Sequence, residues 1–204
     1  MFMKLYYAPG TCALACWISL EWSGLDYEVE RVKLGSEEYL KVNPLGMLPA
    51  LDVPDYKIVT QANAVLNYIA VSSPESQLGP DADLQAQTEF NEIMAFLTGD
   101  FHPSFWPIFS PNRYTVSKKA DELDAVVQAA YQRVDRAMTF LDGLIGDTDH
   151  VYRNQRTVAD PYAFVMATWS VKTPKPWTEY PNLARFMKVM KEDEAVAKVL
   201  QLSK

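Results

Sequence analysis

Residues 43–71 read NPLGMLPALDVPDYKIVTQANAVLNYIAV, and this stretch decides the fold of the N-terminal part of the chain. Asn43-Pro44 is a turn dipeptide, and Gly46 permits backbone angles that other residues resist. Residues 48–51 form a predicted strand whose second residue is proline, which cannot donate to a sheet and belongs at a strand start or an edge. Since an X-Pro bond can be cis at modest cost, we expect Leu48-Pro49 to present the Leu48 N–H and C=O to a peptide-like ligand.

A helix is predicted to begin at Gln61-Ala62, shortly after this strand. Helix N-termini bind anions through N–H groups that have no partner within the helix. A strand edge beside a helix start therefore suits a ligand with a peptide backbone and a carboxylate. A surface turn, a hairpin and a core helix explain the same residues equally well, so the local pattern leaves both interpretations open.

The first 75 residues predict a small α/β unit with a mixed sheet. Short apolar or alternating runs predict strands, and longer apolar runs predict helices. The strands are expected at residues 2–7, 26–32, 48–51 and 56–59, the helices at 11–20 and 62–71, and a polar loop at 36–38. The order is βαβ followed by ββα.

The rest of the chain is predicted to be helical. A polar, breaker-rich linker at residues 72–80 separates a first domain (1–75) from a second (82–204). Apolar residues recur at helical spacing over residues 86–101 and 123–145, and the proline- and aromatic-rich segment 101–112 should break the first of these helices. Thr157 to Asp160 predicts a helix cap, ahead of a buried helix at 162–169 and terminal helices at 181–190 and 193–202.

The composition and charge argue against several classes of function. A net charge of −7 argues against nucleic acid or an anionic membrane as the principal partner. No apolar run approaches the ~20 residues that span a bilayer, and the N-terminus lacks the pattern of a secretory signal. Cys12 and Cys16 do not make a disulfide framework, which fits a cytoplasmic protein. His102 and His150 lack the spacing of a metal site, so no metal is expected.

Cys12 is the candidate reactive group, because it lies between the first strand and the first helix. A thiol at a helix N-terminus has its thiolate stabilised by the helix dipole and free N–H groups, which lowers its pKa. A buried and inert cysteine is the alternative. Cys16, one turn later, is interpreted as packing. Tyr7, at the end of the strand, can donate its hydroxyl to a ligand sulfur or simply belong to the core.

His102 and the aromatic residues around it form a second candidate region. His102 can line a substrate cleft or titrate near neutral pH, or it can cap a helix or pack among aromatic rings. Phe105, Trp106 and Phe109 can wall an apolar substrate pocket. A domain interface would have the same composition, so both interpretations remain.

Five motifs, in order along the whole chain, resemble the glutathione S-transferase family, and the bacterial beta class most. They are LYYAPGTCALA at residues 5–15, NPLGMLPAL at 43–51, QANAVLNYIA at 61–70, TVADPYAF at 157–164 and YPNLARFMKVMKEDEAV at 180–196. The resemblance implies a thioredoxin-like N-terminal domain, an all-helical C-terminal domain and a homodimer with its active site near the interface.

The resemblance also implies roles for single residues. Cys12 would contact the sulfur of glutathione, the co-substrate, and Leu48, before Pro49, would pair with its cysteinyl backbone. Gln61 and Ala62 would receive the γ-glutamyl carboxylate. Ala62 departs from the usual serine, which removes a hydroxyl donor worth on the order of 1.5–3 kcal/mol.

A further part of the pattern is Asp100-Phe101-His102, which matches the family's acidic-apolar-His stretch, although Pro103 replaces the basic residue that often follows. The implied activity is conjugation of glutathione to small electrophiles, or glutathione-dependent reduction of disulfide substrates. A binding or assembly module without turnover is the alternative, and Ala62 is the feature that favours it.

Overall fold

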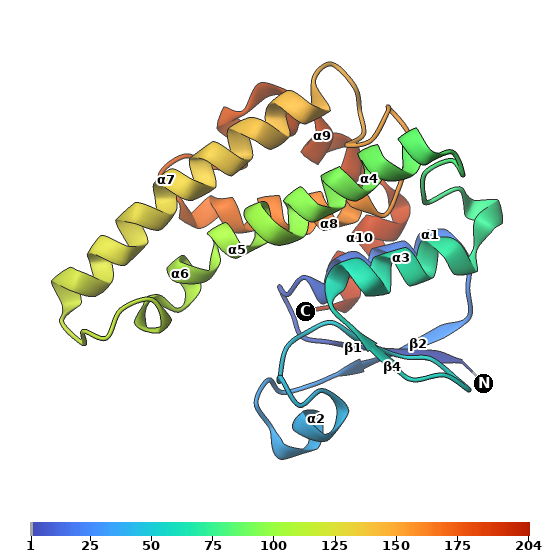
Figure 1. Ribbon diagram of the computed structural model, residues 1–204, viewed down its shortest axis with the longest axis horizontal. Coiled ribbons are helices and arrows are strands. Elements are labelled where there is room, and N and C mark those ends of the chain that lie inside the picture. Colours follow the sequence, from blue (N-terminus) through green and yellow to red (C-terminus); the bar gives the residue numbers. More distant parts are fainter. Residues whose placement is uncertain (1) are drawn as a thin grey trace.

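A mixed sheet organises the first part of the chain in the computed structural model, which describes residues 2–204 (Figure 1). Its strands are β1 (Met3–Tyr7), β2 (Tyr27–Arg31), β3 (Ala50–Asp52) and β4 (Ile58–Thr60), in the spatial order β2-β1-β3-β4. β1 pairs in parallel with β2, and the other two pairs are antiparallel. The predicted mixed sheet is therefore confirmed.

Three helices cover the two faces of this sheet: α1 (Ala13–Ser23), α2 (Glu37–Val42) and α3 (Ala62–Ser72). Successive side chains of a strand point to opposite faces, and β1 follows this rule. Leu5 and Tyr7 belong to the main core, whereas Tyr6 packs with Tyr39 of α2 in a second, smaller cluster. In Figure 1, α1 and α3 accordingly lie on one side of the sheet and α2 on the other. This arrangement is thioredoxin-like.

Two local predictions were wrong. Residues 36–38 were expected to form a loop, but Ser36 caps α2 and its hydroxyl accepts a hydrogen bond from the Tyr39 N–H. Acidic residues in the first turn favour the same helix because they complement its dipole. The proline strand was expected to begin at Leu48, but β3 begins at Ala50. Pro49 thus precedes the strand, where a missing N–H costs nothing.

The second part of the chain is helical, as predicted. Its α-helices are α4 (Leu84–Phe96), α5 (His102–Ser104), α6 (Trp106–Phe109), α7 (Ala120–Ile145), α8 (Ala159–Thr168), α9 (Pro181–Glu192) and α10 (Glu194–Leu202). A π-helical turn at Leu97–Phe101 and 3₁₀ turns at Pro74–Ser76, Pro111–Arg113, Trp169–Lys172 and Trp177–Glu179 join them. Helix α4 ends at Phe96 and continues into the π-helical turn, before the proline- and aromatic-rich segment 101–112 that was expected to break it; within that segment only the short helices α5 and α6 form. Among residues 2–204, no helix has both the length and the apolar character to cross a membrane.

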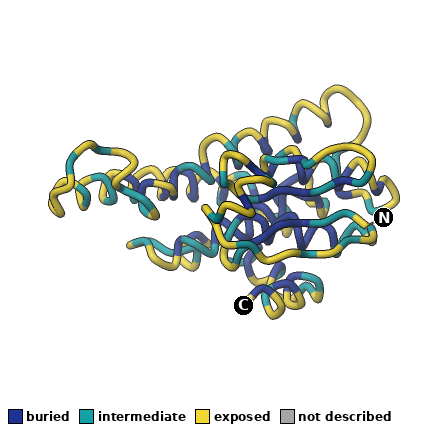
Figure 2. Tube along the Cα trace, turned by 90° about the horizontal axis from the view of Figure 1, so that it is seen from below, coloured by how far each residue is buried: buried dark blue, intermediate teal, exposed yellow. Residues whose placement is uncertain are grey.

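Helix α8 is the centre of the helical part, and every residue from Ala159 to Ala167 is buried. The Asp160 carboxylate accepts hydrogen bonds from the N–H groups of Val151 and Thr157, both at 2.8 Å. The predicted cap is therefore confirmed. Helix α1 packs against α8 and α10 and so joins the sheet to the helical part. Figure 2 shows that buried residues gather there, whereas the projecting ends of α6 and α7 are mostly exposed or half-buried.

Candidate active site

The loop before β3 is held in one conformation by its own side chains. The Asn43 amide and the Tyr39 hydroxyl both donate to the Met47 carbonyl oxygen at 2.7 Å. Gly46 has a φ of 64°, in the left-handed region that glycine adopts without strain. The Leu48-Pro49 peptide bond is cis, the form that the X-Pro sequence suggested.

Cys12 lies directly against this loop. It occupies the N-cap position of α1, and its thiol donates to the Leu48 carbonyl oxygen at 3.3 Å. Only 5% of the Cys12 surface is exposed. A carbonyl oxygen has two lone pairs, so Leu48 can accept a further hydrogen bond from a ligand. The fold therefore brings together two residues that the sequence placed in separate motifs.

The acidity of the Cys12 thiol agrees with the alternative of a buried cysteine and not with the lowered pKa that a helix N-terminus suggested. Burial raises its pKa from 9.0 to about 12, and hydrogen bonds with the backbone of Cys12 and Ala13 lower it by a smaller amount. The stabilisation by the helix start that the sequence suggested is present, but desolvation of the thiolate outweighs it. Cys12 is therefore a neutral thiol near pH 7, and it can donate its S–H to an anionic sulfur.

The start of α3 forms the next wall of the site. In the antiparallel pairing, Ala50 lies opposite Thr60, which places Gln61 next to Pro49. Gln61 has a φ of 73°, and its side chain makes no capping hydrogen bond. A non-glycine residue in this region is strained, and such strain gathers at functional sites. The first N–H groups of α3 have no partner within the helix, so they can receive a carboxylate.

Tyr7 belongs to the core rather than to this group of residues. Its ring packs against Trp17 with a centroid distance of 4.8 Å, and 7% of its surface is exposed. No hydrogen bond joins its hydroxyl to another of residues 2–204. Its predicted role as a donor to a ligand sulfur stays a prediction.

His102 lies in the helical part among aromatic rings. The His102 Nδ1 is 2.8 Å from the Tyr162 hydroxyl oxygen. The ring centroids of Trp106 and Trp169 lie 5.5 and 5.1 Å from the centroid of the imidazole ring. Burial lowers the pKa of His102 to about 4. Of the interpretations left open, titration near neutral pH does not hold, because the imidazolium ion would lose its hydration there, whereas the packing among aromatic rings is what the structure shows. Asp100 is exposed on the π-helical turn before it.

The three aromatic residues predicted to wall a pocket differ in exposure. Trp106 is 38% exposed and Phe109 is 48% exposed, so both can meet a ligand. Phe105 has no exposed surface, and its ring packs against Phe109 and Trp169. It supports the ring of Phe109 from behind, and its predicted place in the lining was wrong.

Trp169 makes a contact with the loop before Cys12 that the sequence did not predict. Its indole N–H donates to the Gly10 carbonyl oxygen at 2.9 Å, while its ring lies 5.3 Å from that of Phe109. It thereby links the aromatic cluster to the loop that leads into Cys12. The sequence showed Trp169 only as the end of a buried helix, and no local signal marked this contact.

Comparisons with known proteins agree with this geometry. The model of the glutathione S-transferase N-terminal domain matches residues 1–71. A glutathione S-transferase of Xanthomonas campestris pv. campestris, GST-4.5, is 35% identical over 98% of both chains. A sphingomonad glutathione S-transferase complexed with glutathione has a TM-score of 0.85 and 31% identity, and a beta class enzyme of Sphingomonas chungbukensis has 0.85 and 29%, both over 98% of each chain.

The match to the Xanthomonas relative extends over nearly the whole length of both proteins, and the matching structures share both the sheet and the helical part. The resemblance that the five motifs indicated is therefore confirmed. The chain belongs to the glutathione S-transferase family.

Proposed function

We propose that this protein conjugates glutathione, as co-substrate, to small electrophiles. One observation carries the proposal: the Cys12 thiol lies 3.3 Å from the Leu48 carbonyl, directly before the cis Pro49 and beside the start of α3. This arrangement offers a thiol partner, a backbone donor and acceptor, and a helix N-terminus to one ligand. Glutathione has the complementary groups, namely a sulfur, a peptide backbone and a γ-glutamyl carboxylate.

In the proposed complex, the cysteinyl backbone of glutathione pairs with the N–H and C=O of Leu48. Its γ-glutamyl carboxylate meets the N-terminus of α3 at Gln61 and Ala62, where the N–H groups and the helix dipole favour an anion. Ala62 supplies no hydroxyl, so this contact is weaker by one hydrogen bond than with serine. Asp100 and His102 are proposed contacts from the helical part.

The reaction needs a glutathione thiolate. Its proton passes to solvent. The single S–H of neutral Cys12, which donates to the Leu48 carbonyl oxygen in the free protein, turns to the sulfur anion and favours the thiolate. With an aryl chloride, the new carbon–sulfur bond replaces the carbon–chlorine bond, and chloride leaves. The exposed rings of Trp106 and Phe109 hold the apolar electrophile near the sulfur.

We propose thiol–disulfide exchange through Cys12 as a side activity, because Cys12 occupies the position where the glutathione sulfur is expected. The Cys12 thiolate would attack oxidised glutathione, form a mixed disulfide and release one glutathione thiolate. Since burial raises the pKa of Cys12 to about 12, few molecules hold the thiolate at neutral pH. The exchange should therefore be slow there.

We further propose a cytoplasmic homodimer whose two domains are residues 1–75 and 82–204. The motifs shared with the family support this assembly, and two unpaired cysteines fit a reducing compartment. Light scattering on the purified protein should give twice the mass of one chain.

A melting curve and a turnover assay test the main proposal together. At millimolar glutathione the melting temperature should rise by several degrees, because a ligand that binds only the native state stabilises it. Chlorodinitrobenzene should be conjugated faster than in the absence of protein. A shift without turnover would support the binding module in place of the enzyme. If neither a shift in melting temperature nor turnover is observed, both the enzyme and the binding module are excluded.

A further inference from the structure

Tyr162 of helix α8 makes the hydrogen bond that holds the side chain of His102. Its hydroxyl oxygen is 2.8 Å from Nδ1 of His102. Within residues 2–204, the side chain of His102 and the hydroxyl of Tyr162 have no other hydrogen-bonding partner than each other. Since Tyr162 is only 1% exposed, this one contact has to satisfy its hydroxyl.

The direction of this hydrogen bond follows from the burial of Tyr162. Burial raises the pKa of Tyr162 far above its usual value of 10.0, so the hydroxyl keeps its hydrogen at neutral pH. If Nδ1 of His102 were the donor, the hydroxyl hydrogen would point at no acceptor, and a buried donor without a partner is costly. If Tyr162 donates instead, the bond satisfies both groups. Nδ1 is therefore the acceptor.

The aromatic neighbours of His102 leave the orientation of its ring to this hydrogen bond. Trp106 and Trp169 pack against the imidazole with centroid distances of 5.5 and 5.1 Å. A half turn of the imidazole about its Cβ–Cγ bond exchanges Nδ1 with a carbon atom of similar size, so these ring contacts change little. Of the three neighbours, Tyr162 alone distinguishes the two orientations, because its hydroxyl requires a nitrogen opposite.

The other ring nitrogen of His102, Nε2, points away from Tyr162. It is not among the buried polar atoms of residues 2–204 that lack a partner, and His102 is only partly buried, so Nε2 is open to a ligand. Burial lowers the pKa of His102 to about 4, and the neutral ring carries a single proton. Because Nδ1 accepts a hydrogen bond, that proton is on Nε2.

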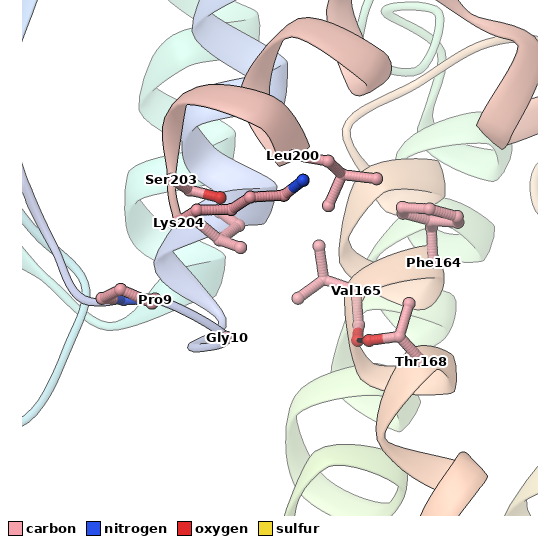
Figure 3. Close-up of a pocket in the computed structure, with 9 residues that line it drawn as sticks. Pro9, Gly10, Phe164, Val165, Thr168, Leu200, Ser203 and Lys204 are labelled. Atoms are coloured by element: carbon pink, nitrogen blue, oxygen red, sulfur yellow. Dashed lines mark hydrogen bonds between the residues drawn. The ribbon is translucent and has the colours of Figure 1, made fainter.

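We propose that Tyr162 is a positioning residue for glutathione binding: its hydroxyl holds His102 as the neutral tautomer with the proton on Nε2, and this N–H donates to glutathione. The inference rests on the proposed function, which places His102 in contact with that ligand. Figure 3 shows a pocket beside the loop at Gly10, lined by Phe164 of helix α8, and neither Tyr162 nor His102 is among its lining residues. The pair belongs instead to the aromatic cluster around Trp106.

Nitrogen NMR of the ligand-free protein, with isotope-labelled histidine rings, tests the tautomer directly. At neutral pH we expect Nε2 of His102 to be of the protonated, pyrrole type and Nδ1 to be of the unprotonated, pyridine type. Both signals are assigned by their absence from His102→Phe. In Tyr162→Phe, the Nδ1 signal should move to the position of a pyridine-type nitrogen without a hydrogen bond. A proton on Nδ1, or an Nδ1 signal that Tyr162→Phe leaves unchanged, would overturn the proposal.

Tyr152→Phe is the matched control. Tyr152 is also 1% exposed, but its hydroxyl donates to the Ala86 carbonyl oxygen at 3.4 Å and not to His102. This variant should leave both nitrogen signals of His102 and the affinity for glutathione unchanged. If Tyr152→Phe had the same effects as Tyr162→Phe, the loss of any buried hydroxyl would explain them, and the assignment would be refuted.

Titration calorimetry with glutathione tests the consequence for binding. Affinity should fall roughly threefold to tenfold in His102→Phe, as expected for one hydrogen bond, and roughly twofold to fivefold in Tyr162→Phe. The double variant should bind no more weakly than His102→Phe, because Tyr162 acts through His102.

Additive losses in the double variant, or an unchanged affinity of Tyr162→Phe, would overturn the positioning role. Absence of glutathione binding to the unaltered protein would overturn the proposed function itself. The two failures are distinguishable, because the nitrogen spectra of the ligand-free protein decide the tautomer of His102 without glutathione.

Discussion

Cys12 should react far more slowly than an ordinary cysteine, because its thiol is protonated across the physiological pH range. Burial raises its pKa from 9.0 to about 12. At pH 7 this leaves roughly one thiolate in 10⁵ molecules, about 1,000-fold fewer than a group with a pKa of 9.0 would have. The Cys16→Ala variant leaves Cys12 as the sole thiol. Alkylation of this thiol by iodoacetamide, followed by mass spectrometry and compared with free N-acetylcysteine, should be roughly 30-fold slower or more at pH 7, because the greater nucleophilicity of a high-pKa thiolate offsets part of its smaller population.

The pH dependence separates this explanation from simple blocking of access. The rate should rise about tenfold per pH unit between pH 7 and pH 9.5, because the thiolate population rises by that factor. The control is Cys12→Ser in the Cys16→Ala background, which should give no adduct. A rate that levels off above pH 8, or one close to that of N-acetylcysteine, would mean that the thiolate is stabilised and that the reasoning is wrong.

Three further predictions follow from single contacts. Ala62→Ser adds one donor at the start of α3 and should tighten glutathione binding several-fold in titration calorimetry, as a bond of about 1 kcal/mol would; equal or weaker affinity would place the carboxylate elsewhere. Trp169→Phe keeps a ring but loses the hydrogen bond to Gly10, and it should lower the free energy of unfolding in urea by about 1 kcal/mol; no loss would mean that this bond does not join the two parts. The pKa of His102 is about 4 in the folded protein and 6.5 in the unfolded chain. The stability that neutral His102 contributes is therefore fully present above pH 6.5, and it decreases by up to about 3 kcal/mol as the pH falls toward 4. In His102→Gln, urea denaturation over this range should depend less on pH, and an unchanged dependence would refute the assignment.

Much of the fold could be predicted because its signals are local. The period of the apolar residues gave the strands and helices, and the Thr157–Asp160 pattern gave the cap of α8. Helix α2 was missed because it is only one and a half turns long and is polar over its first turn. A serine cap followed by two glutamates was the signal that could have revealed it.

The site could be predicted only in part, because its chemistry depends on contacts between distant residues. The thiol of Cys12 and the carbonyl of Leu48 are 36 positions apart, and the resemblance alone brought them together. The pKa of Cys12 depends on how much water the fold removes around the sulfur, which no spacing of residues reports. The contact from Trp169 to Gly10 spans 159 positions and involves a backbone oxygen, so the side chains of the sequence carry no trace of it.

The central claim is that glutathione binds with its γ-glutamyl carboxylate at the start of α3. Titration calorimetry of the unaltered protein with glutathione, and with the analogue in which a hydrogen replaces that carboxylate, tests it most directly. The account predicts saturable binding of glutathione, and affinity for the analogue lower by roughly tenfold to hundredfold, as the loss of charge-assisted hydrogen bonds worth about 1.5–3 kcal/mol requires. Equal affinity for the two ligands, or no binding of glutathione, would contradict it.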